Sequence, residues 1–180
     1  MDIEPVTTTL KNGLAVTVRE LRPDDRERMA RAVRSLDAQT IYTRLFSHRK
    51  ELTEAGLDRI MRTDPQCEVA IVATIGSGDD ESIVGAGRYV VTTDAPLRKA
   101  EVAFTVEEDF QGQGIAGRLL QALAAVARAR GIAVFEADVL SENPSMLRVF
   151  ERSGLPMRKR NEGGVLHVEL TLGEATGGAA

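Results

Sequence analysis

Three glycines near the middle of the chain have a spacing that can hold a phosphate group. Gly112, Gly114 and Gly117 form the pattern G-x-G-x-x-G within the stretch FTVEEDFQGQGIAGRLLQAL. Glycine lets the backbone approach a ligand closely, and amide groups at the N-terminus of a helix favour an anion. A glycine loop that precedes a helical pattern therefore indicates a pyrophosphate site, and the question is which compound carries the pyrophosphate.

A dinucleotide is the first candidate for this spacing. Asp138 lies 21 residues after Gly117, near the position of the ribose-binding acid in that motif. In the dinucleotide motif, however, the strand runs directly into the first glycine. Here five residues, EEDFQ, separate Val106 from Gly112, and too little chain follows for a doubly wound domain. This interpretation is disfavoured, and the pattern G-x-x-x-x-G-K-[ST] of a P-loop is absent.

Acyl-coenzyme A is the second candidate. Residues 111–116, QGQGIA, have the pattern [QR]-x-x-G-x-[GA] between a strand and a long helix. A purely structural role for the glycines would cost on the order of 1 kcal/mol for each one inside a helix relative to alanine, which favours a ligand. The residues expected to contact it in this loop are Gln111, Gly112, Gln113, Gly114, Ile115, Ala116 and Gly117. Arg118 follows the loop and could reach a phosphate, but a solvated arginine is the favoured interpretation.

The hydrophobic pattern predicts the elements around this loop. Alternating apolar residues predict strands at 13–21, 67–76, 82–93, 99–106 and 132–140, and a hairpin over 155–173 that turns near Gly163-Gly164. Apolar residues at helical spacing predict helices at 22–36, within 39–64, at 112–131 and at 143–154. This order indicates one α+β domain over 1–172 with a mixed sheet, and 173–180 is expected to be a flexible tail.

The loop and the order of elements resemble the Gcn5-related N-acetyltransferase (GNAT) superfamily. The likeness covers nearly all of 14–171 and includes ENPSMLRVFERSGL, where the family has a second cofactor helix that begins at an asparagine. The resemblance implies a mostly antiparallel sheet with splayed central strands flanked by helices. It also implies acetyl-CoA as the cofactor and transfer of an acetyl group to a primary amine.

Glu101 is the candidate base that would deprotonate this amine. In KAEVAFTV, Glu101, Ala103 and Thr105 share one face of the strand. A carboxylate there can accept a proton directly or through a water, although a solvent-facing acid beside Lys99 explains the residue almost as well. The stretch AEVAFTVEEDFQGQGIAGRLL is similar to bacterial protein lysine acetyltransferases of the Pat type, in which a glutamate at this position is the general base. IYTRLFSHRKELT also resembles the Y-x-R-F-F stretch of that subgroup, with Leu45 in place of the first Phe.

The resemblance assigns further roles around the thioester. The oxyanion would be stabilised by backbone amides of the strand before the loop, at Phe104, Thr105 and Val106. Asn143 is expected to cap the helix at 143–154, and the resemblance adds a contact with the pantetheine arm.

No acid for the departing thiolate is evident in the sequence. Phe150 occupies the position at which many GNAT enzymes have a tyrosine, and phenylalanine cannot donate a proton. The thiolate therefore leaves unaided or another group serves. Tyr42 is a weak candidate, Tyr89 is expected in the core, and His167 is expected to be an isolated strand or surface residue.

Charge and composition disfavour a nucleic-acid binder, a membrane protein and a secreted protein. The chain has 180 residues and a net charge of −4, with basic residues scattered among acids, which disfavours a nucleic-acid binder. No apolar run reaches the roughly 20 residues of a membrane helix, and the N-terminus lacks a signal-peptide pattern. The single cysteine, Cys67, excludes an internal disulfide and a cysteine-based zinc site, and no metal is expected. A cytoplasmic protein is expected.

The sequence thus predicts an acetyl-CoA-dependent N-acetyltransferase in which the amine attacks the thioester directly. A protein lysine is the preferred acceptor, by resemblance. A small-molecule amine is the alternative acceptor, and a non-catalytic acyl-CoA-binding regulatory module is the alternative function, motivated by Phe150 and opposed by Glu101. The protein is expected to act as a monomer or a homodimer.

Overall fold

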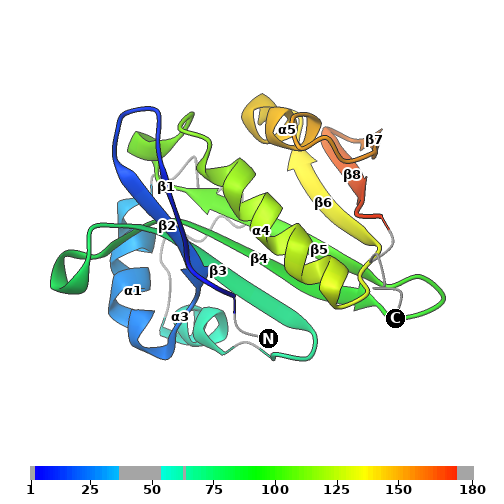
Figure 1. Ribbon diagram of the computed structural model, residues 1–180. Helices are drawn as coiled ribbons and strands as arrows, with labels where there is room; N and C mark the ends of the chain where they lie inside the picture. Colours follow the sequence, from blue (N-terminus) through cyan, green and yellow to red (C-terminus); the bar gives the residue numbers. More distant parts are fainter. Residues whose placement is uncertain (1–2, 37–53, 63, 174–180) are drawn as a thin grey trace, which may run out of the picture.

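A computed structural model describes residues 3–36, 54–62 and 64–173. In this part of the chain, eight strands form one sheet with helices on both of its faces (Figure 1). The strand order is β1-β2-β3-β4-β5-β6-β8-β7, and every neighbouring pair is antiparallel except β5 and β6. The expected α+β fold with a mixed, mostly antiparallel sheet is therefore confirmed.

The bounds of the elements agree closely with the hydrophobic pattern. The strands are β1 Val6–Thr9, β2 Ala15–Glu20, β3 Glu68–Ile75, β4 Ser82–Thr93, β5 Lys99–Val106, β6 Val134–Leu140, β7 Met157–Glu162 and β8 Val165–Thr171. The α-helices in the described residues are α1 Arg26–Ser35, α3 Glu54–Met61, α4 Ile115–Ala129 and α5 Pro144–Glu151. Short 3-10 turns are η1 Pro23–Asp25, η2 Gly78–Asp80 and η3 Glu108–Phe110.

The strand β1 is the element that the sequence pattern missed. It pairs with β2 from Val6↔Val18 to Thr9↔Ala15, across a turn that contains Asn12 and Gly13. The predicted helix at 112–131 begins three residues later, because Gly112 and Gly114 have positive φ angles of 74° and 89°. Of the helices predicted within 39–64, α3 is present, and residues 39–53 lie outside the described part.

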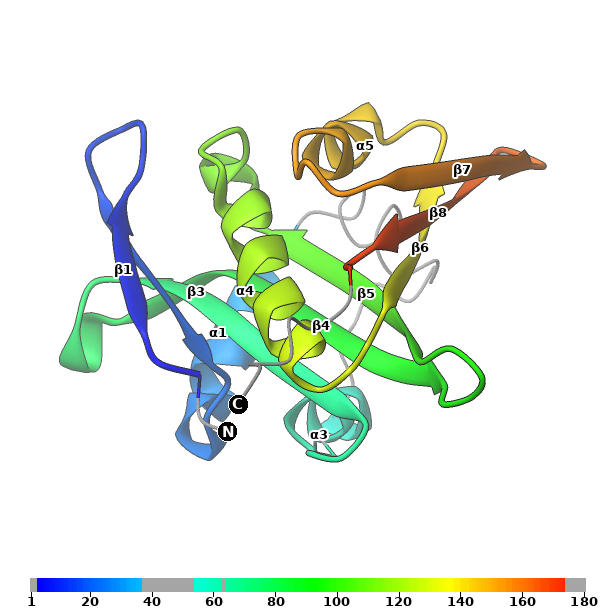
Figure 2. The same cartoon turned by 45° about the vertical axis from the view of Figure 1, so that its right-hand side comes forward.

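Two apolar cores lie on opposite faces of the sheet. The larger one lies beneath α4 and α5, and α4 contributes one buried stripe: Ile115, Leu119, Leu120, Leu123, Ala124, Val126 and Ala127. The smaller core lies beneath α1 and α3 and includes Met29, Leu57, Val72 and Ile83. Figure 2 shows α4 across the centre of the sheet with α1 and α3 behind it.

Glycine in β4 lets α4 approach the sheet. A Cβ atom at Gly87 would lie 2.9 Å from the Phe104 ring and 3.3 Å from Leu123, and one at Gly85 would lie 3.0 Å from Ile115. Such distances are closer than ordinary carbon contacts of about 3.5–4.0 Å. The two glycines therefore fix how deeply the first half of α4, and the loop before it, sits on the sheet.

The strands β5 and β6 separate after a short parallel ladder. They pair at Lys99↔Val134, Ala100↔Phe135 and Glu101↔Glu136, and the ladder ends there. Beyond Glu101, β5 continues against β4 alone, whereas β6 continues against β8 alone as far as Leu140↔Val165. The expected splay of the central strands is confirmed, and Glu101 stands at its vertex.

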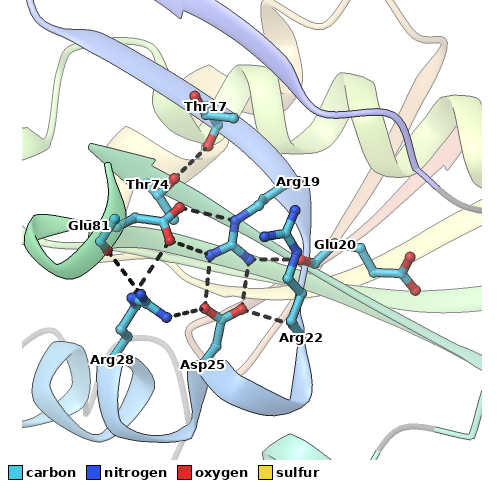
Figure 3. Close-up of polar contacts among 9 residues, drawn as sticks. Thr17, Arg19, Glu20, Arg22, Asp25, Arg28, Thr74 and Glu81 are labelled. Atoms are coloured by element: carbon cyan, nitrogen blue, oxygen red, sulfur yellow. Dashed lines mark hydrogen bonds and ion pairs between the residues drawn. The ribbon is translucent and has the colours of Figure 1, made fainter. Parts of the chain in front are cut away.

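A buried ion-pair network anchors the start of α1 to the sheet (Figure 3). The Arg19 guanidinium on β2 donates to both carboxylate oxygens of Asp25 at 2.7 and 2.8 Å, and to Glu81 from Nε at 3.1 Å. The Asp25 carboxylate also accepts the backbone N–H of Arg22 at 2.9 Å. The side chains of Arg19 and Asp25 are 3% and 0% exposed, so the pair is out of contact with water.

Candidate active site

The glycine loop leaves the end of β5 and enters α4 through two left-handed residues. Gly114, with a φ angle of 89°, occupies the N-cap position of α4, and Gly112 has a φ angle of 74°. These angles favour glycine over any residue with a side chain. The first backbone bond of the helix joins Arg118 N to Gly114 O at 3.2 Å, so the amides before it lie in the first turn, where no helical acceptor precedes them.

The loop has room for a ligand. A Cβ atom at Gly112 or Gly117 would have no heavy atom of the described chain within 4 Å, so packing within the chain does not require glycine at 117. The buried side-chain oxygen of Gln113 has no hydrogen-bond partner in the described part of the chain. Open space and the amide donors at the N-terminus of a 15-residue helix together fit the pyrophosphate of acetyl-CoA.

The other predicted cofactor residues offer mainly backbone. The side chains of Phe104, Val106 and Ile115 are 4%, 3% and 1% exposed and point into the core beneath α4. Gln111 donates from Nε2 to Val106 O at 3.2 Å, which ties the loop to the end of β5. Thr105 lies on the opposite, more open face of β5.

The β1–β2 hairpin contacts this loop and the first turn of α4 through two cationic side chains, Lys11 from the hairpin and Arg118 from α4, and the sequence pattern did not predict these contacts. Lys11 Nζ donates to Gly112 O at 3.3 Å. Arg118 Nε donates to Thr8 Oγ1 at 2.7 Å, so Arg118 is half-buried and bound to β1 rather than solvated as expected. The Asn-Gly pair in the missed turn was the signal that could have predicted this hairpin.

Asn143 caps α5, as predicted. Its Oδ1 accepts the backbone N–H of Met146 at 3.2 Å, and Pro144 follows in the first turn. The helix lies beside the separated end of β6 in both views (Figures 1 and 2). Asn143 therefore belongs to the splayed side of the sheet, across from the glycine loop.

Glu101 faces the open side of the sheet. Ala100, Val102 and Phe104 point into the core beneath α4, so Glu101 projects from the opposite face and is exposed. It makes no hydrogen bond or ion pair with the residues that the structure describes. Its carboxylate is therefore available to a ligand at the point where β5 and β6 separate.

A charged hollow surrounds Glu101 on this face of β5, β6, β8 and β7. Its lining comprises Thr92, Glu101, Glu136, Ala137, Asp138, Arg158, Arg160, His167, Val168 and Glu169. Glu101, Glu136, Glu169 and Arg158 form one row across the four strands, since each pairs with the next in the sheet register. We refer to this surface as the charged hollow.

Lys99 joins three strands at the base of the hollow. Its Nζ lies 2.8 Å from Glu136 Oε1 and 2.8 Å from Glu169 Oε1. Hydrogen bonds with Glu136 and Glu169 raise the pKa of Lys99 to about 12, and the hydrogen bond from Lys99 lowers the pKa of Glu169. One ammonium thus pairs with two carboxylates, whereas Glu101 in the same row has no such partner among the described residues.

His167 is not the isolated residue that the sequence indicated. Its strand position is confirmed, but its Nδ1 is hydrogen-bonded to the Asp138 carboxylate on β6, and its Nε2 lies 3.5 Å from Glu162. Asp138 therefore belongs to the open face of the sheet, with no link to the glycine loop as the dinucleotide interpretation required. The pairing of β6 with β8 was needed to predict this contact.

Neither Phe150 nor Tyr89 can act as an acid in this site. The Phe150 side chain is 1% exposed, and its ring centre lies 6.3 Å from that of Phe104 in the core. Tyr89 is fully buried, and burial raises the pKa of its hydroxyl. Tyr42, the remaining tyrosine, lies outside the described residues.

The described residues contain neither a metal-binding cluster nor a membrane-spanning helix. No group of three or more His, Cys, Asp or Glu side chains that could hold a metal ion occurs there. Within those same residues, no helix is long and apolar enough to cross a membrane.

Comparison with known proteins agrees with this geometry. Residues 36–155 match the model of the Acetyltransferase (GNAT) family. The chain is 33% identical over 123 residues to Acetyltransferase PA5475 of Pseudomonas aeruginosa, covering 68% of this chain and 65% of that protein. It is 31% identical over 170 residues to Acetyltransferase Pat of Mycolicibacterium smegmatis, covering 94% of this chain and 50% of that protein. The chain thus spans from half to just under two thirds of these curated relatives.

The solved structures agree as well. The GNAT domain of S. lividans PAT superposes with a TM-score of 0.83 at 32% identity, covering 93% of this chain and 96% of that domain. A putative acetyltransferase from Salmonella typhimurium, solved with acetyl-CoA, shares the fold with a TM-score of 0.70 at 17% identity. The chain belongs to the GNAT acetyltransferase family, for which acetyl-CoA is the acetyl donor.

Proposed function

We propose that this protein transfers the acetyl group of acetyl-CoA directly to the side-chain amine of a protein lysine, in the cytoplasm, with Glu101 as the general base. The observation that carries the proposal is the position of Glu101. It is an exposed carboxylate with no partner among the described residues, at the vertex where β5 and β6 separate. The similarity to the GNAT domain of S. lividans PAT supports a lysine as the acceptor.

The chain would hold the donor along the separated strands. The glycine loop and the first turn of α4 would bind the pyrophosphate, with the cations of Lys11 and Arg118 nearby. Asn143 at the start of α5 would contact the pantetheine arm. Bound in this way, acetyl-CoA supplies an activated thioester carbonyl between β5 and β6. The backbone amides of Phe104, Thr105 and Val106 would stabilise negative charge on the carbonyl oxygen.

The acceptor would enter from the charged hollow. A lysine ammonium has a pKa near 10.4 and cannot attack a carbonyl while it is protonated. The Glu101 carboxylate attracts the ammonium and takes its proton, directly or through a water, and the neutral nitrogen then attacks the thioester carbonyl. The C–N bond forms as the C–S bond breaks, the nitrogen gives its second proton to solvent, and the products are an acetylated lysine and the coenzyme A thiolate.

The departing sulfur would leave as a thiolate without help from the described aromatic residues. Phe150 lacks a proton to give, and the Tyr89 hydroxyl is sealed in the core. A free thiol has a pKa near 8.5, so a thiolate is a much better leaving group than an amine anion, and an acid is not essential. The substitution at position 150 is thus compatible with catalysis.

The experiment measures release of the coenzyme A thiol from acetyl-CoA in the presence of different acceptors. The acceptors are an acyl-CoA synthetase with accessible lysines, the same protein with its lysine amines blocked by reductive methylation, and a panel of polyamines, amino acids and aminoglycosides. We expect release with the unblocked protein only, together with acetyl-lysine detected by mass spectrometry. Release with a small amine alone would replace the proposed acceptor. Acetyl-CoA binding without release with any acceptor would support a regulatory module instead.

A further inference from the structure

Two charged side chains of the hollow make no hydrogen bond or ion pair with a described residue, although Arg158 lies opposite Glu169 in the register and its charge acts on that carboxylate. Glu136 and Glu169 share Lys99, Asp138 is bonded to His167, and Arg160 Nε lies 3.0 Å from Glu162. The exceptions are Glu101 at one end of the row and Arg158 at the other, since neither makes a hydrogen bond or ion pair with a described residue. A ligand that filled the hollow would therefore meet one carboxylate and one guanidinium.

The separation of these two charges indicates the size of the ligand. Glu101 and Arg158 occupy the same row, three strand spacings apart through Glu136 and Glu169. Neighbouring strands lie about 4.8 Å apart, so the two backbones are about 14 Å apart. An extended peptide advances about 3.3 Å for each residue, so about four residues bridge this distance. A free amino acid is too short to place its amine and carboxylate at both ends.

Arg158 lies on β7, the edge strand of the sheet, which is held by its pairing with β8. This strand pairs with β8 from Met157↔Leu170 to Glu162↔Val165 and is the last strand of the sheet. Because side chains alternate along a strand, Arg158 and Arg160 face the hollow, whereas Lys159 faces the other side. There Lys159 Nζ lies 3.4 Å from Glu151 Oε1 on α5. Lys159 therefore provides a matched control with the same charge on the same strand.

We propose that the charged hollow selects a protein lysine that has an acidic side chain about four residues away in an extended segment, with Glu101 receiving the lysine and Arg158 the acid. This inference deepens the proposed function and rests on it. Arginine suits this role because its planar guanidinium can bind a carboxylate through two parallel hydrogen bonds. The row thus sets both which amine reaches the thioester and which sequence surrounds it.

The test uses fluorescent peptides that contain one lysine in an otherwise neutral sequence, with a single Glu placed at each position from six residues before the lysine to six after it. Peptide affinity is measured by anisotropy and KM by coenzyme A release. We expect Glu near the fourth position to tighten binding and lower KM by about fivefold relative to Gln, the upper range for an exposed ion pair. The preference is expected to fall as salt rises.

The variants separate a role in recognition from a general effect of charge. Arg158→Gln is expected to abolish the preference for Glu and Arg158→Glu to reverse it in favour of Lys, while Lys159→Gln leaves it unchanged. Equal affinity of the wild type for all the peptides would overturn the inference, as would equal losses in the Arg158 and Lys159 variants. If the preference appears in binding but no lysine is acetylated, the proposed function fails and the docking site stands. If the peptides are acetylated without a preference for Glu, the proposed function stands and the docking inference fails.

Discussion

Replacement of Asp25 by asparagine would leave a guanidinium buried beside a neutral side chain. Asparagine would keep one acceptor oxygen but present an NH₂ group in place of the other, so Arg19 would lose the negative charge and one of its hydrogen bonds of 2.7 and 2.8 Å. It would retain only Glu81 as an anionic partner within 4 Å among the described residues. Removing one partner of a buried ion pair costs about 3–5 kcal/mol. Because Glu81 remains, we expect a loss of about 3 kcal/mol in the free energy of unfolding. For a domain of this size, that lowers Tm by roughly 6–12 °C.

The matched control is Asp58→Asn. Asp58 Oδ1 lies 2.7 Å from Arg26 Nη1, the same distance as the buried contact, but these side chains are 43% and 39% exposed. Exposed ion pairs contribute about 0–1 kcal/mol. The assay is urea unfolding of the wild type and both variants at pH 7, followed by circular dichroism. A loss for Asp25→Asn no larger than that for Asp58→Asn would refute the reasoning that burial decides the cost.

The same pair predicts how stability changes with pH. Burial alone would raise the pKa of Asp25, but hydrogen bonds from Arg19 and from the Arg22 amide, with the charges of Arg19 and Arg28, hold it below the ordinary value of 3.8. A lowered pKa in the folded state means that the contribution is fully present above about pH 3.9 and is lost as the pH falls through the folded-state pKa. The difference between the wild type and Asp25→Asn should therefore shrink below about pH 3.9. A difference that stays constant down to pH 2 would contradict this assignment.

Two further predictions concern the glycine loop and the ion pairs of Lys99 with Glu136 and Glu169. Gly117 lies in α4 with open space around it, so Gly117→Ala should raise the free energy of unfolding by up to about 1 kcal/mol. Gly117→Glu, once circular dichroism shows that it folds as well as the wild type, should weaken acetyl-CoA binding at least tenfold in calorimetry. Unchanged binding by the Glu variant would show that the pyrophosphate does not bind at this turn. Lys99 should titrate at about 12 by NMR, since hydrogen bonds with Glu136 and Glu169 raise its pKa, and its contribution to stability should be present below pH 10.5 and disappear as the pH rises through 12. Replacing both glutamates by glutamine should return the titration midpoint of Lys99 to about 10.4. A wild-type midpoint already at that value would show that Lys99 does not form these two ion pairs in solution.

Local patterns predicted most of the fold because they report on neighbouring residues. Strand β5 and strand β4 have the predicted bounds, and the hairpin turns at Gly163-Gly164 as expected. Alternation along β5 correctly separated Glu101 from the buried Val102 and Phe104. The first strand, Val6–Thr9, was missed although its β-branched residues and the Asn-Gly turn carry a hairpin signal.

Contacts between distant segments could not be predicted from such patterns. Lys99 meets Glu136 and Glu169 only because β6 lies between β5 and β8, an order that no local period specifies. The same order brings His167 to Asp138. The helix predicted at 22–36 includes Asp25 near its start, but the buried pairing of Asp25 with Arg19 depends on how η1 packs against β2. The order of strands in the sheet and the packing of η1 against β2 determine these contacts.

The proposed reaction depends most directly on the role of Glu101 in accepting a proton. The decisive measurement compares the wild type with Glu101→Gln in single-turnover acetylation of a lysine acceptor, with the Kd of acetyl-CoA measured on the same samples. We predict a rate reduced by about 10²–10⁴-fold, the usual contribution of a general base, and a Kd that is unchanged because Glu101 faces away from the glycine loop. A variant that acetylates at the wild-type rate with the same Kd would show that the carboxylate at the vertex of the splay takes no part in the chemistry.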